Sequence, residues 1–136
     1  MNTEKLVQEH AAIGASVAEL RKLIEAGVAE QADGIVKAIG AMSSKIVEHL
    51  ASEDKTLYPG LAGSSDPEVA AMGRKFQSEM GNIASAYMEF SGAWNAGAKV
   101  AAEPDRFREQ ANGIIKALQE RIQREHAELY PAAQRS

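Results

Sequence analysis

The sequence contains no cysteine in its 136 residues. This absence excludes disulfide bridges, thiolate metal sites and cysteine nucleophiles together. Any metal ligands must therefore come from imidazole or oxygen-bearing groups.

Long apolar runs are also missing, since no stretch approaches the roughly 20 residues that a helix needs to cross a bilayer. The N-terminal segment MNTEKLVQEH is polar and charged, unlike a secretory signal peptide. A net charge of −4 makes a nucleic-acid partner electrostatically unfavourable. We therefore expect a cytoplasmic protein that binds neither membranes nor nucleic acids.

The composition is otherwise ordinary, with 45% hydrophobic and 25% charged residues, as in soluble globular proteins. A chain of 136 residues is long enough for one domain with its own core, so we predict a single domain over residues 1–136. Composition leaves open whether this domain forms a homodimer or binds an unknown protein partner.

Four segments place residues at alternating spacings of three and four, which is typical of the buried stripe of an amphipathic helix. The first stripe is Leu6, His10, Ile13, Val17, Leu20 and Ile24. The second is Ile35, Ile39, Met42, Ile46, His49, Glu53 and Leu57. The third is Val69, Met72, Phe76, Met80, Ile83, Tyr87, Phe90 and Trp94. The fourth is Phe107, Ala111, Ile114, Leu118, Arg121, Glu125 and Leu129.

Prolines and caps separate these segments. Pro59 disfavours helical geometry at the residue before it, so we expect the second helix to end near Tyr58. Asp66 followed by Pro67 is a strong signal for the start of the third helix. Pro131 is expected to close the fourth.

The predicted helices lie near residues 3–26, 31–58, 67–95 and 104–130, and AGAKVAAE is interpreted as a weak connector between the last two. No segment alternates with a period of two, so no strands are expected. Long helices with short connections favour an all-α fold, an antiparallel up-down-up-down four-helix bundle.

One sequence motif occurs at the ends of both the second and the fourth predicted helix. HLASEDKTLYP begins at His49 and RIQREHAELYP begins at Arg121. The two copies share the frame Glu-x-x-x-Leu-Tyr-Pro, but four residues before the Glu one has histidine and the other has arginine. In an antiparallel bundle these two helix ends lie at the same end of the molecule.

Five polar residues on the predicted inner faces fall in one layer at that end, given a rise of about 1.5 Å per residue. They are His10, His49, Glu53, Arg121 and Glu125. Burying charges is costly unless they pair or bind a metal. The set therefore has two interpretations: a polar network bridged by Arg121, or a metal site, since imidazole and carboxylate together suit Fe, Zn or Mn.

With these residues the sequence resembles the hemerythrin-like, HHE cation-binding domain family over essentially its whole length. The matching motifs are Glu9-His10-x-x-Ile13, His49-x-x-x-Glu53-x-x-x-Leu57-Tyr58-Pro59 and Glu125-x-x-x-Leu129-Tyr130-Pro131. The family's complete site is a di-iron centre held by histidines and two bridging carboxylates. The resemblance implies that the metal ligands here are His10, His49, Glu53 and Glu125.

The chain departs from the family pattern at three ligand positions. Met80 and Ala84 stand where the third-helix histidines belong, and Arg121 stands where the fourth-helix histidine belongs. All three departures affect one iron of the pair. The resemblance therefore implies no more than one ion per chain, Fe or Zn, rather than an intact di-iron centre.

Three further residues lie near this layer. His126 adjoins Glu125 but should point about 100° away around the helix, so we interpret it as partly exposed rather than as a ligand. Tyr58 and Tyr130 are expected to close the end of the bundle with their rings.

Two functions remain open. The first is a mononuclear site used to bind or sense a metal or a small ligand. The second is a metal-free regulatory or protein-interaction module in which the guanidinium of Arg121 replaces the cation. In both, Arg121 should lie within hydrogen-bond reach of Glu53, Glu125 or both. No nucleophile–base pair is visible in the sequence, so we do not expect an enzyme.

Overall fold

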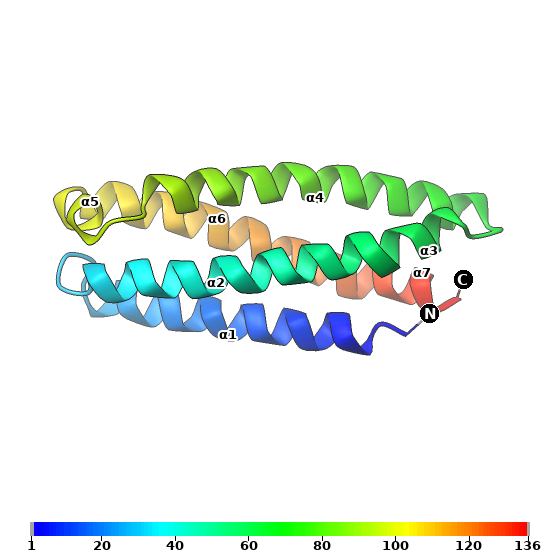
Figure 1. Cartoon of the computed structure of the whole chain (residues 1–136), viewed down its shortest axis with the longest axis horizontal. Coiled ribbons are helices and arrows are strands. Elements are labelled where there is room, and N and C mark those ends of the chain that lie inside the picture. Colours follow the sequence, from blue (N-terminus) through cyan, green and yellow to red (C-terminus); the bar gives the residue numbers. More distant parts are fainter. Residues whose placement is uncertain (1, 136) are drawn as a thin grey trace.

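The computed structural model describes residues 2–135, and four long helices dominate it. They are α1 (Glu4–Ala26), α2 (Ala32–Ser52), α4 (Pro67–Ala93) and α6 (Pro104–Arg124). Successive long helices run in opposite directions, and both chain ends lie at the same end of the bundle (Figure 1). The described part of the chain contains no strand. The predicted all-α, antiparallel four-helix bundle is therefore confirmed.

The second and fourth helices do not stop where their prolines suggested. Each passes through a five-residue π-helical turn, η1 (Glu53–Leu57) or η2 (Glu125–Leu129), and then continues as α3 (Tyr58–Ala62) or α7 (Tyr130–Arg135). The predicted ends at Tyr58 and Pro131 were wrong.

The reason is the wider turn that precedes each proline. The Tyr58 amide bonds to the Glu53 carbonyl and the Tyr130 amide to the Glu125 carbonyl, each five residues back rather than four. After this turn Pro59 falls in the first turn of α3, where a helix needs no amide donor from it. A proline can therefore continue the helix instead of ending it.

The predicted helix start at Asp66 is confirmed, and two further local features shape the ends of the other helices. The Asp66 side chain accepts a 2.9 Å hydrogen bond from the Glu68 amide and caps α4. Gly27 has a φ of 123°, which favours glycine, at the end of α1. The predicted weak connector contains a short helix, α5 (Gly97–Ala102), because buried Val100 anchors it to the core.

Two hydrophobic clusters fill the interior, and a polar layer separates them along the helices. The larger cluster runs from Ile13 and Ile46 to the far end, where the Trp94 and Phe107 rings meet edge to face at 5.3 Å. The smaller cluster includes Leu6 and both Leu-Tyr pairs of the repeated motif. The five predicted polar residues lie between the clusters and are all buried.

Close contact between α3 and α4 seals the smaller cluster. A Cβ added at Gly73 would lie 2.8 Å from the Cβ of Leu61, so glycine permits this approach. Within residues 2–135, no helix is both long enough and apolar enough to cross a membrane.

Candidate metal centre

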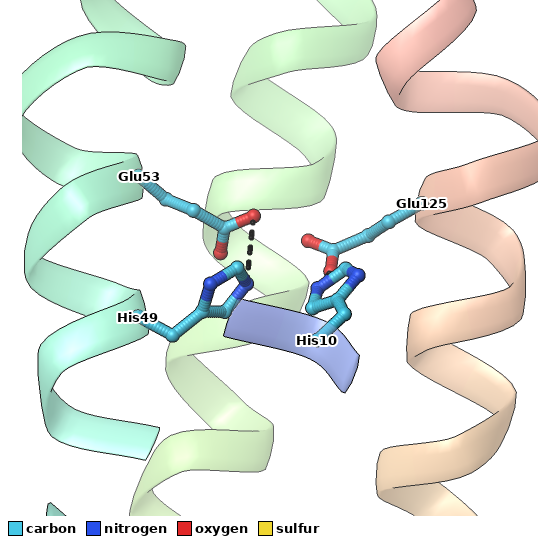
Figure 2. A group of neighbouring side chains, drawn as sticks. All are labelled: His10, His49, Glu53 and Glu125. Carbon is cyan, nitrogen blue, oxygen red and sulfur yellow. Dashed lines mark ion pairs between the residues drawn. The ribbon is translucent and has the colours of Figure 1, made fainter. Parts of the chain in front are cut away.

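Four potential metal ligands from four elements of the bundle converge in the polar layer. His10 comes from α1, His49 from α2, Glu53 from η1 and Glu125 from η2 (Figure 2). One ligand atom from each residue lies within 4.8 Å of the other three, and all four residues are buried. The structure thus brings together the four predicted residues.

Each histidine faces a carboxylate across this small space. His10 Nε2 lies 2.8 Å from Glu125 Oε1, and His49 Nε2 lies 3.4 Å from Glu53 Oε2 (Figure 2). The longer distance leaves His49 Nε2 without a hydrogen-bond partner in the described chain, together with Glu53 Oε1 and Glu125 Oε2. Buried polar atoms without partners each cost about 1–3 kcal/mol.

The donor atoms of this group are of the kind that a metal ion binds. Two imidazole nitrogens and two carboxylates are ligands that first-row transition metals accept. The three partnerless atoms lie on three of the four candidate ligand residues, and a cation among them would satisfy them. The donor set fits a metal ion, so this buried group could hold one.

The two carboxyl groups differ in their electrostatic environment. Burial, reinforced by the charge of Glu125, raises the pKa of Glu53 to about 7. Burial also acts to raise the pKa of Glu125, but hydrogen bonds with His10 and Glu53 and the charge of Arg121 outweigh it and hold this pKa below its usual range.

The pKa values of the two histidines also shift in opposite directions. Burial lowers the pKa of His10 despite its contact with Glu125. Burial also acts to lower the pKa of His49, but contacts with Glu53 and Glu9 outweigh it and raise this pKa. Near neutral pH Glu125 is therefore ionised and His10 is neutral, and both states suit metal binding.

Glu9 orients His49, a role that was not predicted from the sequence. His49 Nδ1 donates to Glu9 Oε1 at 2.9 Å, and the Ser52 hydroxyl donates to Glu9 Oε2 at 2.9 Å. A proton on Nδ1 leaves the Nε2 lone pair of neutral His49 facing the site. The signal available in the sequence was the position of Glu9 beside His10, within the motif that carried the resemblance.

His126 is exposed but still contacts the site from outside. Its Nε2 lies 3.0 Å from Nδ1 of His10, on the far side of that ring from the carboxylates. It is not part of the group of four. Its turn away from Glu125 directs it toward α1, where it supports His10.

The two tyrosines do more than close the end of the bundle. Their rings pack in the smaller cluster, but the Tyr130 hydroxyl lies 3.1 Å from His10 Nε2 and donates to Glu53 Oε2 at 3.2 Å. Burial and the nearby carboxylates raise the pKa of Tyr130, which keeps this hydroxyl protonated as a donor. The Tyr58 hydroxyl accepts a longer bond of 3.4 Å from Arg121.

Arg121 approaches only one of the two glutamates. Its Nε lies 3.5 Å from Glu125 Oε2, outside hydrogen-bond geometry, and no ion pair with Glu53 occurs within residues 2–135. The predicted approach of Arg121 to at least one of the carboxylates is therefore met by its ion pair with Glu125, whereas the interpretation in which Arg121 bridges both carboxylates is not. The guanidinium instead donates to the Phe76 carbonyl at 2.6 Å and lies 4.5 Å from the centre of the Phe76 ring, because α4 offers it both an acceptor and an aromatic face.

A small cavity of about 20 Å³ adjoins the site. His10, His49, Arg121 and Glu125 line its polar side, and its other walls are the apolar side chains Ile13, Ile46, Leu50, Met80, Leu118 and Ile122. Leu50 and Met80 also line a surface groove of about 260 Å³ that reaches Ala84. Met80 is buried and Ala84 half-buried, so the third helix supplies apolar wall where the family pattern has ligands.

The comparisons with known proteins agree with this geometry. A family model described as the hemerythrin HHE cation binding domain matches residues 1–133. No curated protein and no solved structure is significantly similar to the chain. The match spans nearly all of the sequence and includes every residue of the buried group, so the chain belongs to the hemerythrin HHE cation-binding domain family.

Proposed function

We propose that the chain binds one transition-metal ion, Fe or Zn, through His10, His49, Glu53 and Glu125. The observation that carries this proposal is the convergence of two imidazoles and two carboxylates within 4.8 Å of one another, in a buried layer that leaves three of their atoms without partners. A cation there would neutralise the carboxylates and satisfy the partnerless atoms.

The neighbouring residues favour one ion rather than two. On the side where a second ion would lie, the chain offers Arg121, which is cationic, and Met80 and Ala84, which provide no hard ligand. The guanidinium also repels a second cation at short range.

Binding or sensing suits the surroundings better than catalysis. Hydrophobic clusters close both sides of the polar layer, and the adjoining cavity of about 20 Å³ is too small for an organic substrate. The chain's own residues fix the ligands: Glu9 holds His49, His126 holds His10, and Tyr130 donates to Glu53. A bound metal would supply a Lewis-acidic centre able to accept one further small ligand.

Metal occupancy would be sensed through the stability of this end of the bundle. The four ligands join α1, α2, η1 and η2, so an ion that binds only the folded chain ties these elements together. Both chain termini lie at the same end, where a change in rigidity could reach a partner (Figure 1).

A metal-free regulatory bundle is the second candidate, favoured by the complete burial of Arg121 beside Glu125. In this alternative the guanidinium of Arg121 permanently supplies the positive charge that a metal ion would otherwise provide. The missing contact with Glu53 weighs against it, because that carboxylate is then left without a cation.

Metal analysis of protein purified without a histidine tag tests the proposal. We expect about one Fe or Zn per chain and a clear rise in melting temperature when ion is added to the apoprotein. His49→Ala and Glu53→Ala should abolish both effects, whereas Glu48→Gln, an exposed change beside His49, should preserve them. Two ions per chain would contradict a mononuclear site, and failure to bind either metal would leave the metal-free bundle.

A further inference from the structure

Met80 separates a surface groove from the buried polar layer. Its side chain is 6% exposed and lines two spaces at once: the groove of about 260 Å³ beside α4, and the cavity of about 20 Å³ that adjoins the candidate metal ligands. A Cβ added at Gly81, in the wall of the groove, would meet nothing within 4 Å, so the groove is open here. A small solute in the groove can therefore reach the Met80 side chain without any helix separating from the bundle.

The cavity on the other side of Met80 is lined by Arg121, whose hydrogen-bond donors are only partly used. Nη2 of Arg121 donates to the Phe76 carbonyl at 2.6 Å and to the Tyr58 hydroxyl at 3.4 Å, whereas Nε and Nη1 have no hydrogen-bond partner within residues 2–135. Arg121 is only 2% exposed, so bulk water does not solvate these two groups, and leaving them unpaired is costly. The cavity volume of about 20 Å³ exceeds the roughly 10–15 Å³ that a water molecule needs, so one oxygen atom attached to Met80 has both space and donors.

The methionine sulfur is the atom in this wall that can gain such an oxygen. Hydrogen peroxide oxidises a thioether by two electrons. A sulfur lone pair attacks one peroxide oxygen, the O–O bond breaks as the S–O bond forms, and the proton of the transferred oxygen passes to the departing hydroxide to give water. The product is a sulfoxide with a polar oxygen, which disrupts an ordinary apolar core because no donor is available there.

We propose that Met80 is a methionine-oxidation site, at which hydrogen peroxide arriving through the groove forms a sulfoxide whose oxygen accepts hydrogen bonds from the unpaired donors of Arg121. The chain then responds to peroxide by changing one side chain while it stays folded. The inference needs no bound metal, so it stands or falls separately from the proposed metal binding. Met42 provides an internal comparison, because it is fully buried in the larger hydrophobic cluster.

Peroxide treatment of the whole chain in the presence of a chelator tests access to the sulfur. The chelator removes metal ions that would generate radicals, and peptide mass spectrometry measures the oxidation rate of each methionine in native protein and in urea. We expect folding to slow the oxidation of Met80 by less than about tenfold, close to the behaviour of Met88, which is 40% exposed. Met42 should be slowed by more than about a hundredfold, because it reacts only when the core opens.

Glutamine substitutions test the hydrogen bond, since glutamine carries an amide oxygen that accepts, as the sulfoxide oxygen does. In chelator, Met80→Gln should lower the melting temperature by no more than about 3 °C, because Arg121 donates to the introduced oxygen. Met42→Gln is the matched control. It buries the same amide in the apolar cluster and should lower the melting temperature by about 10 °C or more.

Arginine variants identify the donor. In an Arg121→Leu background the introduced oxygen loses its donor, so Met80→Gln should cost at least about twice as many degrees as it does in wild type. If Arg121→Leu does not fold, Arg121→Lys takes its place, because a single ammonium replaces the planar fork. Arg124→Leu is the control, since Arg124 lies 4.8 Å from the centre of the same Phe76 ring but pairs with Glu79 and is 41% exposed; the cost of Met80→Gln should not change in that background.

Three results would overturn the inference. The first is a native-state oxidation rate of Met80 as low as that of Met42, which would mean that the groove gives no access to the sulfur. The second is an equal loss of melting temperature in Met80→Gln and Met42→Gln. The third is a cost of Met80→Gln that the Arg121 variant leaves unchanged, which would mean that Arg121 does not bond the added oxygen.

Discussion

The two copies of the repeated motif have the same backbone structure but carry different side chains one turn before the glutamate. The first arm, residues 49–62, and the second arm, residues 121–135, each pass through a π-helical turn that begins at a buried glutamate, and each then continues through Tyr-Pro. The two leucines of the frame are fully buried in the same cluster. The shared frame therefore fixes where each arm delivers its carboxylate.

The residue one turn earlier decides what else each arm delivers. In the first arm His49 faces its own Glu53 and is held from behind by Glu9. In the second arm Arg121 stays 3.5 Å from its own Glu125 and reaches across to α4. One arm thus offers a ligand and the other a permanent positive charge. The pKa values of the two carboxyl groups shift in opposite directions because burial dominates at Glu53, whereas contacts with His10 and Glu53, helped by the charge of Arg121, outweigh burial at Glu125.

The largest expected effect comes from removing that charge. Arg121→Leu should destabilise the apoprotein by on the order of 3–5 kcal/mol, because Glu125 loses its nearby cation in a buried layer. Added Zn²⁺ should reduce the loss, since the ion then neutralises the carboxylates. Thermal unfolding with chelator and with Zn²⁺ measures both values.

His49→Leu provides the comparison from the first arm. It should cost the apoprotein less than Arg121→Leu does, because it removes a titratable imidazole rather than a permanent buried charge. Small and equal losses for Arg121→Leu with and without metal would show that the guanidinium is not needed as a counter-charge.

The support behind His49 has no equivalent behind Arg121, and its removal should weaken metal binding. Glu9→Ala frees the His49 ring and is expected to lower metal affinity about ten- to a hundredfold, the range typical of residues that orient a ligand. Glu9→Gln keeps an acceptor for Nδ1 and should recover part of the loss. Calorimetric titration gives the affinities, and no difference between Glu9→Ala and wild type would remove Glu9 from the site.

Proton competition should act mainly through the first arm. The pKa of Glu53 is raised to about 7 and that of His49 is also raised, whereas the pKa of Glu125 is lowered. Metal must displace protons from the first two groups, so apparent affinity should fall at least about tenfold between pH 8 and pH 6. Calorimetry in buffers of different ionisation enthalpy would detect the released protons, and an affinity unchanged over this range would contradict the assignment.

The sequence predicted the four helices and the four candidate ligands because both depend on spacing along one helix. Glu9 and His126 were not placed at the site, since helical periodicity puts them beside the buried stripe, and only the neighbouring helix turns them into partners for His49 and His10. The reach of Arg121 was missed for a related reason. A long side chain goes to the best acceptor available, and that acceptor, the carbonyl of Phe76, belongs to another helix.

The π-helical turns were missed because an interval of four residues from glutamate to leucine suits an ordinary helix equally well. The sequence contained one sign, a proline two residues after the last position of each predicted buried stripe. The sign was interpreted as a helix end. Its actual meaning is a helix that has widened enough to continue through proline, and this meaning can be tested.

The smallest expected effect is therefore the replacement of either proline. A proline inside a regular helix costs about 3 kcal/mol, so its replacement by alanine would normally stabilise the protein by that amount. Here the amide before each proline already bonds five residues back, and Pro59 occupies the first turn of the next helix. Pro59→Ala and Pro131→Ala should then each change the free energy of unfolding by no more than about 1 kcal/mol, measured by urea denaturation in chelator. Ala51→Pro, at an exposed position inside α2, is the control and should cost about 3 kcal/mol or more. A gain of about 3 kcal/mol from either alanine variant would mean that the proline strains its arm. A gain in one arm alone would mean that the two π-helical turns, alike in their hydrogen bonds, differ in how well they accommodate the ring.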